Sequence, residues 1–156
     1  MKKILWLILL LITVGAKAQT PAAKTNALYD EALAKKLGAD DYGMHKYIMA
    51  FLKTGPTKIA DKAKMAEVQM AHLKNISKLA DDGKLVVAGP FMDRGDVEGI
   101  FIFDVNTIEE AKALTETDPA IRAGVLVMEL RPFYCSAALM EVTKIHKKLA
   151  KKNFID

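Results

Sequence analysis

The stretch KIADKAKMAEVQMAHLKNISKLADDGKLVVAGP, residues 58–90, decides the fold of this chain. In its first part, apolar residues and a histidine recur three or four positions apart: Met65, Val68, His72, Ile76 and Leu79. This spacing places them on one side of an α-helix, which has about 3.6 residues per turn. Gly83 then favours a turn, and the apolar residues 84–88 predict a buried strand. The stretch therefore predicts a long amphipathic helix that leads directly into a strand.

His72 is the polar member of this apolar side, so its imidazole is expected to point inward. An unpaired buried polar group costs about 1 to 3 kcal/mol, so the ring must find a hydrogen-bond partner or line a cavity. Two interpretations stay open. The first is a core histidine bonded to a backbone carbonyl, and the second is a general acid or base, a role that suits histidine because it titrates near neutral pH.

Alternating or continuous apolar patterns predict three further strands, at residues 44–52, 98–105 and 125–131, with Pro132 ending the last one. Thr57 is expected to open the long helix. Thr107 and Glu110 match a capping box and predict a second helix to about residue 116. Asp118 and Pro119 predict a short helical piece that ends at Gly124.

The predicted order is strand, helix, strand, strand, helix, strand, which is the split βαβ arrangement. We therefore expect an α+β, ferredoxin-like βαββαβ fold, with a four-stranded antiparallel sheet and helices on one face. The central strands are apolar on both faces, so the second face also needs a cover. The terminal segments or a second copy of the chain could supply it, and we favour a homodimer.

The first residues have the pattern of a cleavable secretory signal. Lys2 and Lys3 precede the apolar residues 4–14, and Ala16 and Ala18 stand at the positions that a signal peptidase reads. The 11 apolar residues are fewer than the roughly 20 that span a bilayer, so no transmembrane anchor is expected after cleavage. Residues 1–18 are thus the predicted signal peptide of an exported protein, which is periplasmic if the host has two membranes.

Removing residues 1–18 lowers the formal charge from +4 to +1, because three lysines are lost and no acidic residue is. A nearly neutral protein is a poor general binder of nucleic acid. Cys135 is the single cysteine, so no internal disulfide is expected. His45 and His146 have no ligand-like partner nearby in the sequence, and the chain lacks HExxH, paired CxxC, phosphate-binding and GxSxG motifs. We therefore expect neither a metal nor a cofactor.

Two segments flank the predicted domain. Residues 19–43 are predicted to form a tether and a helix that Asn26 caps and Gly38 ends. Residues 135–156 are predicted to form a basic tail with a helix near residues 142–151. The tail is amphipathic and could touch an anionic lipid surface, although we favour a solvated terminal helix.

Several short motifs resemble, in their order and spacing, the YCII-related domain family. They are Tyr47-Ile48-Met49, His72-Leu73, the run from Asp82 to Pro90, Gly99-Ile100-Phe101, Glu109-Glu110-Ala111 and Asp118-Pro119. The resemblance covers residues 44–134. It implies a ferredoxin-like domain of the dimeric α/β barrel type, with a site built from a histidine and an aspartate. Those roles fall on His72 and Asp118, although Asp118 is also explained as an ordinary helix cap.

Taken together, these features favour a small exported enzyme of the lyase or isomerase type, in which His72 moves a proton and Asp118 orients its ring. Asp93 and Arg94, in the loop after Pro90, are candidates for binding the substrate, and a solvated turn is the simpler interpretation of both. The alternatives are a non-catalytic module that binds a small ligand or a protein, and an envelope scaffold that acts through its terminal helices.

Overall fold

The computed structural model describes residues 26–93 and 95–155. The predicted signal peptide and Arg94 therefore lie outside the described residues. The strands are β1 (Met44–Thr54), β2 (Leu85–Pro90), β3 (Val97–Phe103) and β4 (Leu126–Ser136). The helices are α1 (Glu31–Lys36), α2 (Lys62–Asp81), α3 (Ile108–Thr115), α4 (Pro119–Arg122), the 3₁₀ helix η1 (Ala137–Glu141) and α5 (Val142–Leu149).

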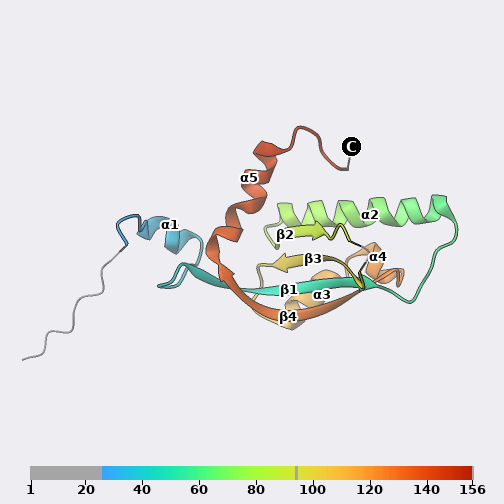
Figure 1. The fold of residues 1–156 in the computed structure, drawn as a ribbon, viewed down its shortest axis with the longest axis horizontal. Helices are drawn as coiled ribbons and strands as arrows, with labels where there is room; N and C mark the ends of the chain where they lie inside the picture. The colour runs from blue at the N-terminus through green and yellow to red at the C-terminus, as the bar shows by residue number, and fades with distance from the viewer. Residues whose placement is uncertain (1–25, 94, 156) are drawn as a thin grey trace, which may run out of the picture.

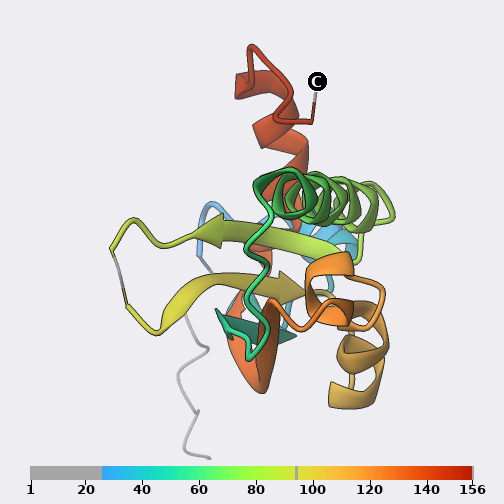
Figure 2. The same ribbon diagram turned by 90° about the vertical axis from the view of Figure 1, so that its right-hand side faces the viewer.

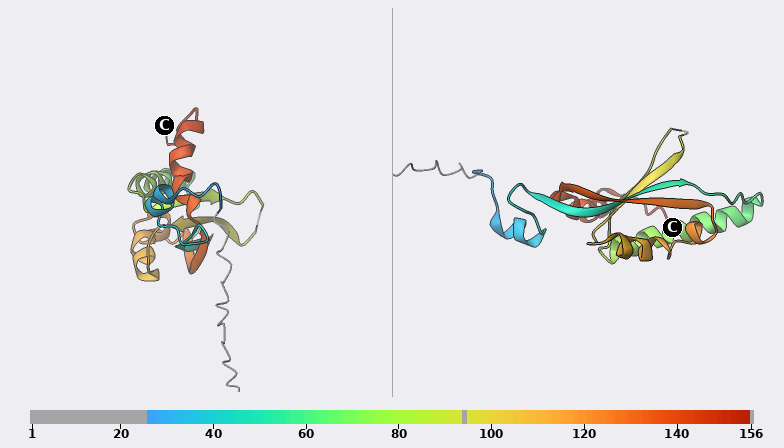
Figure 3. Two further views of the ribbon diagram at one scale, coloured as in Figure 1. Left: turned by 90° about the vertical axis from the view of Figure 1, so that its left-hand side faces the viewer. Right: turned by 90° about the horizontal axis from the view of Figure 1, so that it is seen from below.

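The four strands form one antiparallel sheet in the order β2-β3-β1-β4. Helices α2, α3 and α4 lie together on one side of this sheet (Figures 1 and 3). Both crossover connections place their helices on this same side, as right-handed βαβ units require. The fold is therefore the predicted ferredoxin-like α+β arrangement, with additional helices at both ends.

Helix α2 forms as its apolar stripe predicts, but it begins later than expected. The carboxylate of Asp61 accepts hydrogen bonds from the backbone N–H groups of Ala63 and Lys64, and this cap starts the helix at Lys62 rather than directly after Thr57. At the other end, Gly83 adopts a φ of 70°, which lets the chain turn straight into β2. The stripe buries Val68, His72 and Leu79, of which Leu79 belongs to the main core and His72 stacks on Phe101 of β3.

The main hydrophobic core lies between the sheet and the helices. Its buried members are Ile48, Ala50, Leu52, Leu79, Leu85, Phe101, Phe103, Val105 and Ala111. Residues 48, 50 and 52 alternate along β1, so every second side chain of this strand points to the helices. This core holds α2 and α3 in place against the sheet.

The opposite face of the sheet has a smaller core of Tyr47, Val86 and Ile102. Leu139 and Met140, which belong to η1, pack against it. The chain after β4 therefore crosses one end of this face before α5 begins (Figure 1). Part of the second face is thus covered by the chain's own C-terminal segment, which was one of the two covers expected from the sequence.

The prediction that Pro132 ends the fourth strand is wrong. Strand β4 continues through Pro132 to Ser136, and Pro132 pairs in register with Ile48 of β1. A proline is tolerated here because β4 is an edge strand, whose outward backbone groups need no partner in the sheet. The extension is what allows β1 and β4 to pair over their whole length.

The N-terminal helix also begins later than predicted. Asp30, not Asn26, caps α1 by accepting a hydrogen bond from the backbone of Leu33, whereas Asn26 closes a turn with Leu28. Gly38 follows the helix with a φ of 62°, as expected for a residue that ends one. Within the described residues, no helix is both long enough and apolar enough to cross a membrane.

Candidate functional site

The structure brings His72 and Asp118 together. Nδ1 of His72 lies 2.7 Å from Oδ2 of Asp118, and the two side chains are only 8% and 1% exposed. His72 reaches the pair from α2, and Asp118 reaches it from the N-terminus of α4. The other carboxylate oxygen, Oδ1, accepts a hydrogen bond of 2.8 Å from the backbone N–H of Ala120. Asp118 is therefore both the helix cap and the hydrogen-bond partner of the imidazole.

The carboxylate determines which nitrogen of His72 carries the proton. An ionised carboxylate accepts hydrogen bonds only, so Nδ1 donates and the neutral ring has its lone pair on Nε2. The ring also stacks on Phe101, with centroids 6.0 Å apart and an angle of 17° between the planes. Together these contacts hold the imidazole in one orientation.

The second ring nitrogen of His72, Nε2, forms no hydrogen bond with any group in residues 26–93 and 95–155. It is therefore the atom of the pair that remains available for a proton. In the same part of the chain, the one fully buried side-chain nitrogen or oxygen without a partner is Nδ2 of Asn75.

Two further polar residues adjoin this pair. Asn75 lies on α2, three residues after His72, and Thr117 directly precedes Asp118. The Thr117 hydroxyl lies 2.7 Å from the carbonyl oxygen of Leu114 and 3.1 Å from Oδ1 of Asn75. A hydroxyl has one proton, which the carbonyl requires, so Thr117 must accept a hydrogen bond from the amide. Rotating the amide by 180° meets this need and moves Nδ2 out of its unpaired place. Asn75 then ties α2 to the loop that carries Asp118.

The two predicted substrate-binding residues are not joined to this pair. Asp93 is exposed in the connection between β2 and β3, and no hydrogen bond or ion pair of the described residues links it to His72 or Asp118. Arg94 lies outside the described residues. A surface cavity of about 580 Å³ lies elsewhere, between Lys46, Ile108 and Tyr134, and the pair does not line it.

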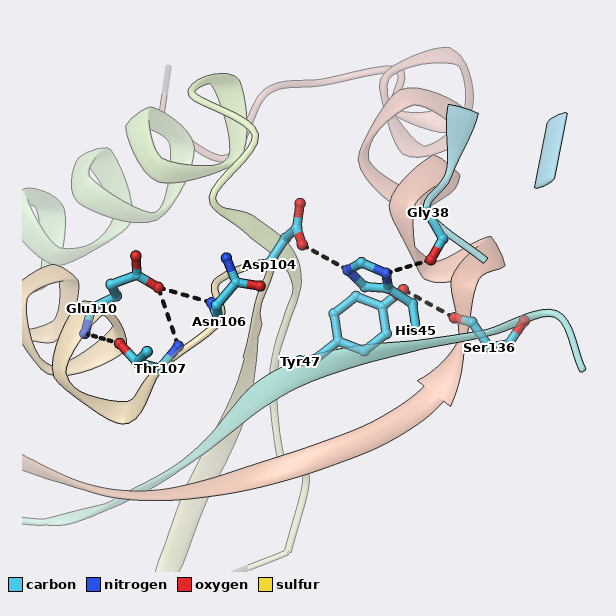
Figure 4. A network of polar contacts seen from close by, with 8 residues as sticks. All are labelled: Gly38, His45, Tyr47, Asp104, Asn106, Thr107, Glu110 and Ser136. Carbon is cyan, nitrogen blue, oxygen red and sulfur yellow. Dashed lines mark hydrogen bonds and ion pairs between the residues drawn. The ribbon is translucent and has the colours of Figure 1, made fainter. Parts of the chain in front are cut away.

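A second polar network, which was not predicted from the sequence, lies at the start of β1 (Figure 4). Nε2 of His45 lies 2.9 Å from a carboxylate oxygen of Asp104, and Nδ1 lies 3.0 Å from the carbonyl oxygen of Gly38. Tyr47 packs edge-on against this imidazole, and its hydroxyl donates to the carbonyl of Ser136. Burial, with the nearby Asp104 carboxylate, raises the pKa of Tyr47 to about 12, so the phenol stays neutral.

Both ring nitrogens of His45 face acceptors, which favours the protonated imidazolium. Burial lowers the pKa of His45, but the Gly38 carbonyl and the Asp104 carboxylate together raise it above the ordinary 6.5. A raised pKa in the folded state contributes stability that is complete below about pH 6.5 and is lost as the pH rises through the folded value.

We therefore expect His45→Gln to lower the free energy of unfolding by about 0.2 to 1 kcal/mol at slightly acidic pH, a small effect because solvent screens this partly exposed pair. The difference from the unsubstituted protein should shrink as the pH rises. Thermal unfolding of both proteins across this range is the measurement, and a difference that grows with pH would contradict the assignment.

No group of three or more His, Cys, Asp or Glu residues in the described part of the chain is arranged to hold a metal ion. The described residues do contain two pairs of a histidine and a carboxylate, His72 with Asp118 and His45 with Asp104. The His72 and Asp118 pair stands out because it is almost completely buried and leaves one nitrogen free.

The model of the YCII-related domain family matches residues 47–134, which is more than half of the chain. This chain belongs to the YCII-related domain family. His72, Asp118 and all four strands fall inside or overlap the matched region. The resemblance found in the sequence is thus confirmed.

A search of curated proteins finds no match to this YCII-related chain. Among solved structures, the chain is similar to a 5-chloro-2-hydroxyhydroquinone dehydrochlorinase from Burkholderia phenoliruptrix AC1100, crystallised with 2,5-dihydroxybenzoquinone. The identity is 21%, the match covers 56% of this chain and 92% of the other, and the TM-score is 0.43. A similarity at this level carries no argument about chemistry.

Proposed function

We propose that this YCII-related protein is a small enzyme of the lyase or isomerase type that uses His72 and Asp118 for proton transfer and needs no cofactor. The observation that carries the proposal is the 2.7 Å contact between the two side chains, which leaves Nε2 of His72 free. A histidine with a purely structural role needs only a neutral acceptor, such as a backbone carbonyl. A buried carboxylate can in addition stabilise the imidazolium that forms when the histidine accepts a proton.

In the proposed reaction, Nε2 of His72 removes a proton from a small molecule that bears a carbonyl or an aromatic ring. The imidazolium that forms is stabilised by the carboxylate of Asp118, which keeps its own charge. The ring then returns the proton, either to another atom of the same molecule or to a leaving group that departs with the bonding electrons. The first outcome is an isomerisation and the second an elimination, and neither requires an oxidant.

The test combines a spectroscopic and a kinetic readout. We expect ¹⁵N NMR of the histidine rings to show a proton on Nδ1 of His72. In Asp118→Asn the amide oxygen can keep its bond to Ala120, so its N–H₂ group then faces Nδ1 and shifts the proton to Nε2. Against a panel of small carbonyl and phenolic compounds, both Asp118→Asn and His72→Gln should reduce turnover by about 10² to 10⁴.

Lys74→Gln serves as the control, because Lys74 is exposed on α2 and the substitution changes neither the pair nor the residues that contact it. The proposal fails if His72 carries its proton on Nε2 in the unsubstituted protein, or if a substrate is found whose turnover survives His72→Gln.

The second candidate function is a non-catalytic module that binds a small ligand. The cavity of about 580 Å³ favours it, because its walls are mainly apolar and it is lined by one cation, the exposed Lys46, which has no ion pair among the described residues. The one carboxylate of the lining, Asp40, already accepts hydrogen bonds from the Tyr134 hydroxyl and two backbone N–H groups. Such a site suits an organic acid with an apolar body. A ligand whose affinity falls in Lys46→Ala and not in His72→Gln would favour this module over the enzyme.

We also propose that the protein is a homodimer formed through the open part of the sheet. The C-terminal segment covers only one end of this face, and Phe51 and Ile100 lie side by side in the uncovered part. Val127 is 41% exposed on the same face, and the connection between β2 and β3, with Phe91 and Met92 exposed, projects to this side (Figure 2). A contact of this patch with itself in a second copy forms a closed, two-fold dimer.

Export remains a proposal that rests on the sequence of residues 1–18, and a periplasmic location follows if the host has two membranes. We expect the protein recovered from fractionated cells to begin at Gln19. Mass spectrometry of its N-terminus is the measurement, and a chain that retains residues 1–18 in the cytoplasm would refute the proposal.

A further inference from the structure

Helix α5 is attached to the rest of the protein through its polar side. The Thr143 hydroxyl lies 3.4 Å from the carbonyl oxygen of Val86 in β2, and Nζ of Lys147 lies 2.6 Å from the carboxylate of Asp81 at the end of α2. From this attachment the helix extends past the β2 edge of the sheet and the C-terminal end of α2 (Figure 1).

The apolar side of α5 faces solvent. Val142, Ile145 and Leu149 follow one another at the helical spacing of three and four residues, and they are 38%, 53% and 77% exposed. Amphipathic helices of folded proteins normally have the opposite orientation, with the apolar stripe on the core. A solvated terminal helix, which we favoured from the sequence, does not account for this arrangement.

The charge of this segment indicates what could cover the stripe. Residues 142–155 contain no acidic residue and five lysines, which are Lys144, Lys147, Lys148, Lys151 and Lys152. The last three have no ion pair among the residues that the structure describes. A complementary surface is therefore negatively charged and accepts a small apolar stripe.

A second copy of the chain does not fit this surface, because a symmetric contact of α5 with itself would oppose like charges. A protein partner would normally need about 800 Å² on each side, which is large for a stripe of three aliphatic side chains. An anionic lipid surface needs no such area, because lysines bind the headgroups while short apolar side chains enter the interface.

We propose that α5 binds the surface of an anionic lipid bilayer. In this arrangement Val142, Ile145 and Leu149 enter the headgroup region, and Lys148, Lys151 and Lys152 reach the lipid phosphates with their long side chains. Thr143 and Lys147 keep the helix attached to the body, so the domain is held at the membrane. The proposal is independent of the reaction at His72.

The first test is co-sedimentation of the protein, as cells produce it, with vesicles of phosphatidylglycerol and phosphatidylcholine in equal parts, compared with phosphatidylcholine alone. The triple variant K148A/K151A/K152A should bind the anionic vesicles more weakly by on the order of 100-fold, since each lysine near such a surface contributes about fivefold. The matched control K58A/K62A/K74A removes the same charge from exposed positions in and before α2, and should bind as the parent does.

A fluorescent probe tests the orientation of the stripe. We expect Leu149→Trp to give a blue-shifted emission on anionic vesicles, measured as a difference from the parent protein, and Tyr42→Trp, at a position that is 88% exposed outside α5, to give none.

Equal binding to both vesicle types, no loss of binding in K148A/K151A/K152A, or an unshifted Leu149→Trp spectrum would each overturn the proposal. So would a stripe variant, I145S/L149S, that binds anionic vesicles normally and changes only the sedimentation coefficient, because the stripe would then be a protein contact.

Discussion

Replacing His72 with leucine is expected to lower the free energy of unfolding by about 3 to 5 kcal/mol, because it leaves a buried carboxylate without its partner. Asp118 is 1% exposed and its Oδ2 would lose its only described hydrogen bond, retaining just the Ala120 N–H on Oδ1. Leucine is similar in size to the imidazole, so the loss reports mainly on the charge. Urea unfolding followed by circular dichroism measures it.

The double variant H72L/D118S should recover much of this loss. Serine removes the buried charge but can still cap α4 through its hydroxyl, as Asp118 now does for Ala120. Lys74→Leu, on the exposed side of the same helix, is the matched control and should change the stability by less than about 0.5 kcal/mol. A loss below about 1 kcal/mol in H72L would show that the carboxylate is not held as described, since an unpaired buried charge costs more than this.

Measuring stability and activity together distinguishes a structural role of the pair from a chemical one. A variant that is stable and inactive, such as Asp118→Asn is expected to be, indicates a role in proton transfer. A variant whose activity falls only in proportion to its folded fraction indicates that the pair serves the core.

Replacing Phe51 with glutamate is expected to convert the proposed dimer into a monomer. Phe51 lies in the open part of the sheet, where Ile100 and Glu129 are its neighbours on the flanking strands. A two-fold contact would bury two new carboxylates close together, and the nearest cations, Lys53 and Arg131, are already paired with Glu129. Like charges brought together in this way cost several kcal/mol, so the dissociation constant should rise by at least about 100-fold.

Analytical ultracentrifugation at several concentrations measures this change, and circular dichroism checks that the monomer keeps its fold. Leu33→Glu is the control, because Leu33 is 44% exposed on α1, away from the sheet. A protein that is monomeric without any substitution, or a F51E variant that remains dimeric, would refute the proposed interface.

Much of the fold follows from short patterns in the sequence. The stripe that contains Val68, His72 and Leu79 identified α2 and the side on which it packs. Thr107 and Glu110 form the predicted capping box at the start of α3, with both reciprocal hydrogen bonds present. These predictions succeeded because they depend on contacts between residues three or four positions apart, which the sequence displays directly.

The errors have the opposite origin. Pro132 looked like the end of a strand, but whether a proline can stay in a strand depends on whether that strand lies at the edge of the sheet. The late start of α2 at Lys62 has a tertiary cause, because the backbone N–H of Thr57 donates to the distant carbonyl of Gly124 and the cap falls to Asp61. A strand's position in the sheet and a backbone contact between distant residues are not visible in a local pattern.

By itself, the sequence determined the α+β fold, the inward direction of His72 and the amphipathic character of the C-terminal segment. Only the tertiary structure decided which groups these residues meet. Asp118 lies 46 positions from His72, Asp104 lies 59 positions from His45, and Asp81 lies 66 positions from Lys147. The physical reason is that periodicity reports which side of a helix is apolar, whereas the surface that each side meets is set by how distant segments pack. For α5 that packing placed the polar side on the protein and left the apolar side open.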